Sequence, residues 1–172
     1  GGECGAAAVS VVGDAVRRIR ARRRSVLAKY DEVWCVIDVE AHGKNPNLTH
    51  AIEQARQAEI QVALSNPCFE VWILWHFSPK CSPFLNCASV VHFLRKAYPK
   101  YSKAHDCFAD LYPNTLTACT IAERQNSLFN GKTGNPTSAV YKIVKLLHEI
   151  VEVPIPLPSP SGRKKQKNRR NN

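Results

Sequence analysis

Two acidic residues at the end of an apolar segment are the first candidates for chemistry in this chain. Asp38 and Glu40 follow the apolar run Val33–Ile37 and stand two positions apart. Alternate residues of a strand point to the same side of a sheet, and ligands of open α/β sheets bind beyond the carboxyl ends of the strands. Carboxylate oxygens are ligands that suit Mg²⁺ or Mn²⁺. The pair therefore predicts a metal site, and the alternative is that both acids cap the next turn and face solvent.

A third acid, Glu70, lies among Phe, Val, Trp, Ile and Leu residues in the segment SNPCFEVWILWHF. A carboxylate in such surroundings is costly unless it is paired, hydrogen-bonded or bound to a metal. The residue types leave three roles open: a metal ligand, a carboxylate at the favourable end of a helix dipole, or an internal partner of an arginine. We expect Glu70 to lie near the same sheet edge as Asp38.

Three further residues are weaker candidates. Asn66 and Pro67 are typical of a helix start, with Asn66 as the cap. His76 lies deeper in the same apolar segment, where a hydrogen-bonded core histidine is favoured over a metal ligand. Lys103 is either a solvated loop residue or a cation that neutralises phosphate charge. We treat Asn66 and His76 as supporting residues of the site.

Positive charge is concentrated in two segments, residues 17–24 and residues 163–170. The chain has a net charge of +10, yet Ser25–Gly162 contains 12 Lys/Arg and 12 Asp/Glu and is neutral. Such basic segments attract phosphates without sequence preference, and the alternative is that they only aid solubility. The predicted nucleic-acid contacts are Arg17, Arg18, Arg20, Arg22, Arg23, Arg24, Lys164 and Lys165.

The predicted elements that position these residues are of the α/β class. Val33–Asp38 reads as a strand buried on both faces, Leu48–Ala58 as an amphipathic helix and Ile60–Leu64 as a second strand. A strand, a helix and a strand over this length form a βαβ unit, so the two strands should be parallel.

Helices are predicted for most of the remaining chain. Two strands are too few for a stable parallel sheet, so either Ala7–Val12 is a strand, or a partner or missing segment supplies more. We expect one domain over residues 1–153 and a disordered basic tail over 154–172. The predicted helices are Ala8–Lys29, Pro67–Phe77, Ala88–Ala97, Asn114–Phe129 and Thr137–Ile150, the last of them opened by Pro136.

Several classes of protein are disfavoured. No apolar stretch is long enough for a membrane span, and the order of basic and apolar residues at the start does not fit a signal peptide. The seven cysteines include no C-x-x-C pair, so neither a zinc site nor a disulfide framework is expected. We expect reduced, mostly buried thiols and a cytoplasmic protein. Lys132 lies in NGKTGN, which lacks the glycine spacing of a P-loop.

The order of five blocks resembles the RloB family, also called AbiLii-like proteins. The blocks are DEVWCVIDVE, VALSNPCFEVWILWHF, YPKYSKA, AERQNSLF and GNPTSAVYKIVKLL, between about Asp31 and Val151. The resemblance implies a prokaryotic anti-phage defence locus, often with an ATPase partner. It also implies a core similar to the Toprim fold, with a small, mainly parallel sheet flanked by helices and a helical C-terminal half.

A Toprim-like core implies a metal-dependent nuclease. The Asp-x-Asp motif of that fold maps onto Asp38 and Glu40, where the second acid is Glu. A glutamate at the end of an earlier strand is also part of the pattern, and GGECGAAAVSVVGD does not match it well. Three explanations stay open: the natural start lies upstream, the lineage has kept only a binding role, or Glu70 supplies the missing ligand.

Two functions follow from the resemblance and the residues. The first is Mg²⁺- or Mn²⁺-dependent cleavage of DNA or RNA, including tRNA, in which Asp38, Glu40 and Glu70 hold or orient the metal and Lys103 neutralises phosphate. The second is a catalytically inactive nucleic-acid-binding module or adaptor subunit of a defence effector complex. Either function is compatible with a homo-oligomer, and neither involves a membrane.

Overall fold

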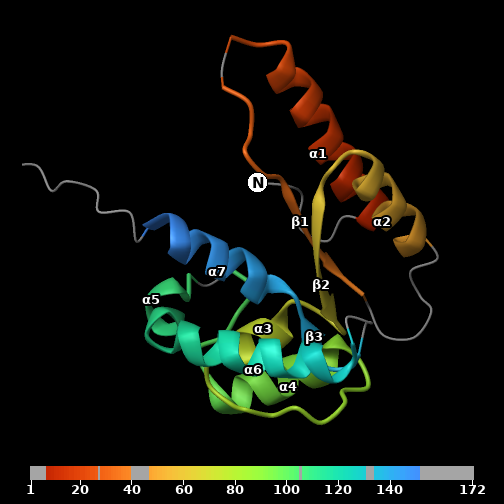
Figure 1. Ribbon diagram of the computed structural model, residues 1–172. Coiled ribbons are helices and arrows are strands. Elements are labelled where there is room, and N and C mark those ends of the chain that lie inside the picture. Colours follow the sequence, from red (N-terminus) through yellow and green to blue (C-terminus); the bar gives the residue numbers. More distant parts are fainter. Residues whose placement is uncertain (1–6, 27, 40–46, 105, 131–133, 152–172) are drawn as a thin grey trace, which may run out of the picture.

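The computed structural model describes residues 7–26, 28–39, 47–104, 106–130 and 134–151. Seven α-helices, one 3₁₀ helix and three strands lie within these ranges (Figure 1). In chain order they are α1 Ala8–Arg23, β1 Trp34–Asp38, α2 Leu48–Gln57, β2 Gln61–Asn66, α3 Glu70–Leu74, α4 Cys87–Ala97, α5 Phe108–Leu111, η1 Tyr112–Asn114, α6 Thr115–Leu128, β3 Thr137–Ser138 and α7 Val140–Val151.

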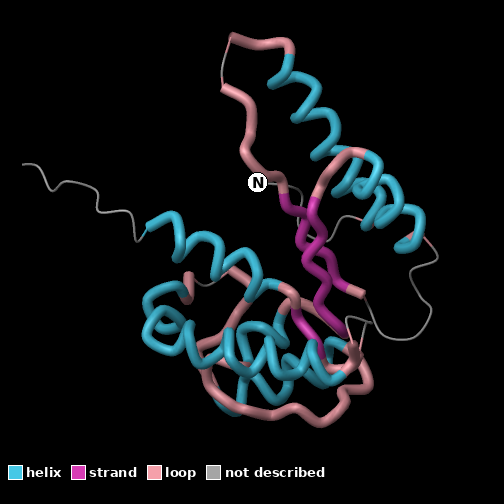
Figure 2. Tube along the Cα trace, viewed as in Figure 1, coloured by secondary structure: helices cyan, strands magenta, loops and turns pink. Residues whose placement is uncertain are grey.

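The strands form a small mixed sheet in the order β1-β2-β3. β1 and β2 are parallel, as predicted, with Trp34 opposite Gln61 and Asp38 opposite Ser65. β3 adds a short antiparallel pairing at the end of β2, where Asn66 faces Thr137. The α/β class is therefore confirmed, and the sheet is mixed with helices around it (Figure 2).

The prediction that the first strand is buried on both faces is wrong. Cys35 and Ile37 are buried, whereas Val36 between them is 40% exposed. The cause is that α1 and α2 cover one face of the sheet, while the other face of β1 is left partly open. Asp38 shares the register of Val36 and so lies on the more open face.

Helix α1 excludes the alternative that Ala7–Val12 is a strand. Ala8 and Val12, one helical turn apart, are buried against the sheet together with Cys35 and Ile37. The predicted helical character is confirmed, but the helix ends at Arg23 and not at Lys29. Its neighbour α2 buries Ala51 and Ala55, whose small side chains allow the two helices to approach closely.

One hydrophobic core joins α1 and α2 to the sheet, and the helical half of the molecule has a second core beyond the end of β2 (Figure 1). Trp72, Leu74 and Trp75 from the segment of α3 pack with Val90 and Leu94 of α4 and with residues of α6. Helix α4 begins at a capping box in which the Asn86 side chain accepts from the Ser89 backbone and Ser89 Oγ is within 3.3 Å of the Asn86 backbone nitrogen. This core holds the segment that carries Glu70.

The predicted starts of two helices are wrong, because residues expected at each helix start pair in the sheet instead. Asn66 is not a helix cap: it is the last residue of β2, and α3 begins only at Glu70. Pro136 does not open the last helix, because Thr137 and Ser138 pair with β2 before α7 begins at Val140. A buried contact of 2.8 Å between the Ser65 and Ser138 hydroxyls ties β3 to β2.

Within the described ranges, no helix is both long and apolar enough to cross a membrane. The predicted tail, residues 154–172, lies outside the described residues, as do Glu40, Lys164 and Lys165.

Candidate metal centre and nucleic-acid interface

Asp38 lies at the carboxyl end of β1 and is half-buried. Its Oδ1 accepts a hydrogen bond of 2.8 Å from the backbone N–H of Phe69, in the turn that leads into α3. This contact joins two segments that are 31 residues apart in sequence. The carboxylate is thereby oriented at the sheet end, beside the residue that precedes Glu70.

Glu70 is the first residue of α3 and is only 5% exposed. Its Oε1 accepts a hydrogen bond of 3.1 Å from the Tyr101 hydroxyl and lies 3.6 Å from Lys103 Nζ. Burial is the largest cause that raises the pKa of Tyr101, and the negative charge of Glu70 is the second. The hydroxyl therefore keeps its proton and remains a donor. The buried carboxylate is thus paired with one donor and one cation, as its cost of burial requires.

The sulfur of Cys87 lies 3.4 Å from the other oxygen of Glu70, Oε2. Cys87 is joined to Cys68 by a disulfide, so that this sulfur carries no hydrogen and the contact is not a hydrogen bond. A thiol at the same place would donate. The expectation that all thiols are reduced is therefore wrong for this pair, while Cys35, Cys81, Cys107 and Cys119 are free.

The structure brings some of the predicted site residues together and leaves others apart. Asp38 accepts from the backbone of Phe69, the residue before Glu70, and Glu70 itself lies 3.6 Å from Lys103 Nζ. Glu70 nevertheless makes its contacts with Tyr101, Lys103 and Cys87. Among the described residues, the one cluster of three potential metal ligands consists of Cys68, Glu70 and Cys87, without Asp38.

His76 and Asn66, the two residues predicted to support the site, each make a hydrogen bond to a backbone carbonyl. His76 is buried, and its Nδ1 lies 2.9 Å from the Trp72 carbonyl, which can only accept, so Nδ1 carries the hydrogen. Burial lowers the pKa of His76. Asn66 donates to the Gly134 carbonyl at 2.8 Å, and its buried Oδ1 has no hydrogen-bond partner among the described residues. Both residues lie in the segment that begins at the end of β2 and runs through α3.

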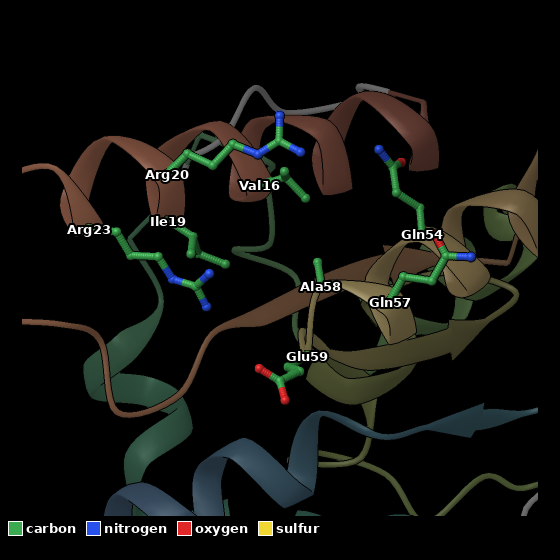
Figure 3. Close-up of a pocket in the computed structure, with 8 residues that line it drawn as sticks. All are labelled: Val16, Ile19, Arg20, Arg23, Gln54, Gln57, Ala58 and Glu59. Atoms are coloured by element: carbon green, nitrogen blue, oxygen red, sulfur yellow. The ribbon is translucent and has the colours of Figure 1, made fainter.

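Four of the five arginines of α1 fall into two groups. Arg17 and Arg18 are paired with Asp14 at 3.0 and 2.6 Å, and the hydrogen bond from Arg18 is the largest cause that lowers the pKa of Asp14. Arg20 and Arg23 instead line an open cavity of about 440 Å³ between α1 and α2. Gln54 and Gln57 of α2 stand across from them (Figure 3).

The lining of this cavity combines basic, polar and apolar side chains. Val16 and Ile19 line it beside the two arginines, and Glu59 is the acidic residue of its lining. The remaining arginines of the cluster do not line it: Arg22 donates to the Ala28 carbonyl at 2.6 Å and stacks on Tyr30, and Arg24 is exposed at the end of α1.

Sequence reasoning missed Cys68, Cys87 and Tyr101. The two cysteines are 19 positions apart, and neither belongs to a C-x-x-C pair that would have marked it. Tyr101 had a usable signal, because it lies two residues before Lys103 in YPKYSKA, and a tyrosine near a candidate cation is a natural partner for a buried acid.

Comparison with known proteins gives one match. The chain matches the model of the RloB-like protein family over residues 2–147, which is most of its length. No match was found among curated proteins or among solved structures. The blocks around Asp38, Glu70 and Lys103 all lie inside the matched range, and the chain belongs to the RloB-like family.

Proposed function

We propose that this protein is a metal-dependent nuclease of a prokaryotic anti-phage defence system, with a Toprim-like core. The observation that supports the proposal most is the hydrogen bond from the Phe69 N–H to Asp38 Oδ1, because Phe69 directly precedes Glu70, whose carboxylate lies 3.6 Å from Lys103 Nζ. An acid, a second acid and a cation at one end of a sheet are the groups that phosphodiester hydrolysis needs.

Each residue has a role in this proposal. Asp38 and Glu40 hold Mg²⁺ or Mn²⁺, whose oxygen-ligand preference fits their carboxylates. The bound ion would supply an activated water and stabilise charge on the phosphate. Glu70 helps to orient the metal. The side chain of Lys103 is 74% exposed, so its ammonium can reach a phosphate while it stays within 3.6 Å of Glu70.

A cleavage assay tests the proposal. The full chain is incubated with supercoiled DNA, single-stranded DNA and tRNA in Mg²⁺ or Mn²⁺, with EDTA as the metal-free control. We expect Asp38→Asn to lower the cleavage rate by at least about 100-fold, because loss of a supporting contact at a metal site already costs about 10–100-fold. Asp31→Asn, an exposed Asp before β1, is the matched control and should cleave like the wild type. Equal cleavage by wild type and Asp38→Asn would remove Asp38 from the site.

A second candidate function is a nucleic-acid-binding or adaptor role without catalysis, favoured by the cavity lined by Arg20 and Arg23. An ATPase or other effector subunit is the protein partner that we propose in either case. Binding of nucleic acid without cleavage of any substrate in either metal would favour this second function.

A further inference from the structure

Beside the buried Glu70 lie two sulfurs, those of Cys68 and Cys87, that the proposed nuclease reaction does not use. Cys68 precedes α3, Glu70 begins it, and Cys87 begins α4. Two sulfurs and a carboxylate oxygen from these residues all lie within 4.8 Å of one another. Cys68 is 1% exposed, Glu70 is 5% exposed and Cys87 is half-buried, so the cluster lies mostly inside the molecule and is not a chance grouping on the surface.

The disulfide leaves Glu70 incompletely satisfied. Among the described residues, the Cys87 sulfur is the one hydrogen-bond-distance neighbour of Oε2, and in the disulfide it has no hydrogen to donate. A buried carboxylate oxygen without a donor carries a free-energy cost. Two changes would remove that cost: reduction, which gives Cys87 a thiol hydrogen, or a cation that touches Oε2 and the two sulfurs together.

We propose that the reduced chain binds a zinc-type divalent cation through Cys68, Glu70 and Cys87. Two thiolates and one carboxylate form a ligand set that zinc accepts, and Mg²⁺ does not favour sulfur. Three protein ligands leave the fourth tetrahedral position open for water. The charges also balance, because two thiolates, one carboxylate, one divalent cation and the Lys103 ammonium at 3.6 Å sum to zero in a buried place.

The site forms only after the disulfide opens. An external dithiol gives two electrons and two protons to the Cys68–Cys87 bond and becomes a disulfide itself. The cation then replaces the two thiol hydrogens, which leave as protons. The sulfurs separate to about 3.8 Å, the spacing of two ligands each about 2.3 Å from a tetrahedral zinc. Oxidation reverses the sequence and releases the cation, so the site is controlled by redox state.

This inference goes beyond the proposed nuclease and does not depend on it. The thiolate site is measured by metal binding alone, whereas the nuclease is measured by cleavage that depends on Asp38. A reduced chain that shows thiolate-to-cobalt absorption and cuts nothing supports the thiolate site and contradicts the nuclease.

Cobalt(II) is the probe, because thiolate ligands give it charge-transfer absorption in the near ultraviolet and tetrahedral geometry gives it intense visible bands. The full chain is reduced with a phosphine, which removes the need for a competing thiol, and titrated without oxygen. We expect saturation at one cobalt per chain and displacement of the cobalt by one equivalent of zinc. The oxidised chain, with the disulfide intact, should give neither band.

Matched variants identify the ligands. Cys68→Ser and, independently, Cys87→Ala should lose most of the charge-transfer absorption, and Glu70→Gln should keep it with at least 10-fold weaker affinity. Cys81→Ser, a half-buried free cysteine outside the cluster, should behave like the wild type. Far-ultraviolet circular dichroism checks that each variant is folded. Absence of both bands in the reduced, folded wild type, or an unchanged titration of Cys68→Ser, would overturn the proposal, and an unchanged affinity of Glu70→Gln would remove Glu70 from it.

Discussion

At the scale of single residues, Glu70 is the centre of the candidate site. Its carboxylate lies in an apolar core and is held by the Tyr101 hydroxyl and the Lys103 ammonium, both at Oε1, while the Cys87 sulfur lies 3.4 Å from Oε2 without donating to it. The sequence indicated that this acid needs a partner, and left open whether the partner is a metal, a helix end or an arginine. The direct partners in the structure are a tyrosine and a lysine, both more than 30 positions away, which no local pattern could identify.

The Tyr101 hydroxyl should contribute measurably to stability. Tyr101→Phe leaves the buried Glu70 oxygen without its donor, and an unsatisfied buried group costs about 1–3 kcal/mol. Urea unfolding of the two proteins measures the loss. Tyr112→Phe is the control, because Tyr112 is 61% exposed. Equal free energies of unfolding for Tyr101→Phe and the wild type would show that the hydroxyl is not needed to pair Glu70.

Lys103 should matter for cleavage more than for folding. Its side chain is largely exposed, so Lys103→Gln should change the free energy of unfolding by less than about 1 kcal/mol. The same substitution should lower the cleavage rate by about 100-fold, the cost typical of losing a group that stabilises developing charge. Lys100→Gln, three positions away and also exposed, is the comparison. A cleavage rate that falls equally in both variants would point to general electrostatic attraction.

At the scale of elements, the turn between β2 and α3 sets the geometry of the site. It presents the Phe69 N–H to Asp38 and turns Glu70 inward, while α3 and the turn after it bury Trp72, Trp75 and His76. His76 donates to the Trp72 carbonyl one helical turn earlier and packs edge-on against the Trp72 ring at 4.8 Å. The neutral ring is therefore part of the core.

Burial of His76 predicts a loss of stability in mild acid. Its pKa in the folded state is lowered from 6.5, so below that value the unfolded chain binds a proton that the folded chain does not yet bind. The free energy of unfolding should therefore be fully retained above pH 6.5 and fall as the pH drops, by at most about 1.4 kcal/mol per pH unit from this residue. His76→Gln should flatten the dependence and His92→Gln, which is exposed, should not. The reverse pattern, in urea titrations between pH 4.5 and 7.5, would contradict this account.

The elements that sequence patterns predicted correctly are those with local signals. β1 and β2 are apolar runs bounded by polar residues, and α2, α4 and α6 begin within one residue of their predicted starts. The errors at Asn66 and Pro136 have one physical cause: Asn66 pairs with Thr137, and this long-range pairing outweighs the local preference of Asn-Pro for a helix start. The partners of Glu70 and the Cys68–Cys87 pair are likewise tertiary contacts, which no spacing rule predicts.

At the scale of the whole molecule, two hydrophobic cores lie on either side of the site. One joins α1 and α2 to the sheet, and the other joins α3, α4 and α6. The segment that runs from the end of β2 into α3 connects the two cores (Figure 1). Asp38 meets this segment through the Phe69 N–H, and Glu70 is buried at the start of α3. The cavity lined by Arg20 and Arg23 lies between α1 and α2, the two helices of the first core.

That cavity should bind nucleic acid in a salt-dependent way. Arg20→Gln/Arg23→Gln should weaken binding of a labelled single strand and lower the slope of log K against log salt by about 1.4, because each lost phosphate contact removes about 0.7 for single strands. Arg17→Gln/Arg18→Gln removes the same charge from residues that Asp14 already pairs, and should change the slope less. Equal slopes for the two double variants would mean that net charge alone drives binding.

The central claim is that Asp38 holds the metal at the end of β1, and direct measurement of Mn²⁺ binding tests it most simply. Electron paramagnetic resonance of free Mn²⁺ gives the bound fraction, and the disulfide is kept intact so that the thiolates of Cys68 and Cys87 do not contribute. We expect the wild type and Asp31→Asn to bind Mn²⁺ with the same affinity and Asp38→Asn to bind at least about 10-fold more weakly. Identical binding curves for wild type and Asp38→Asn would contradict the account.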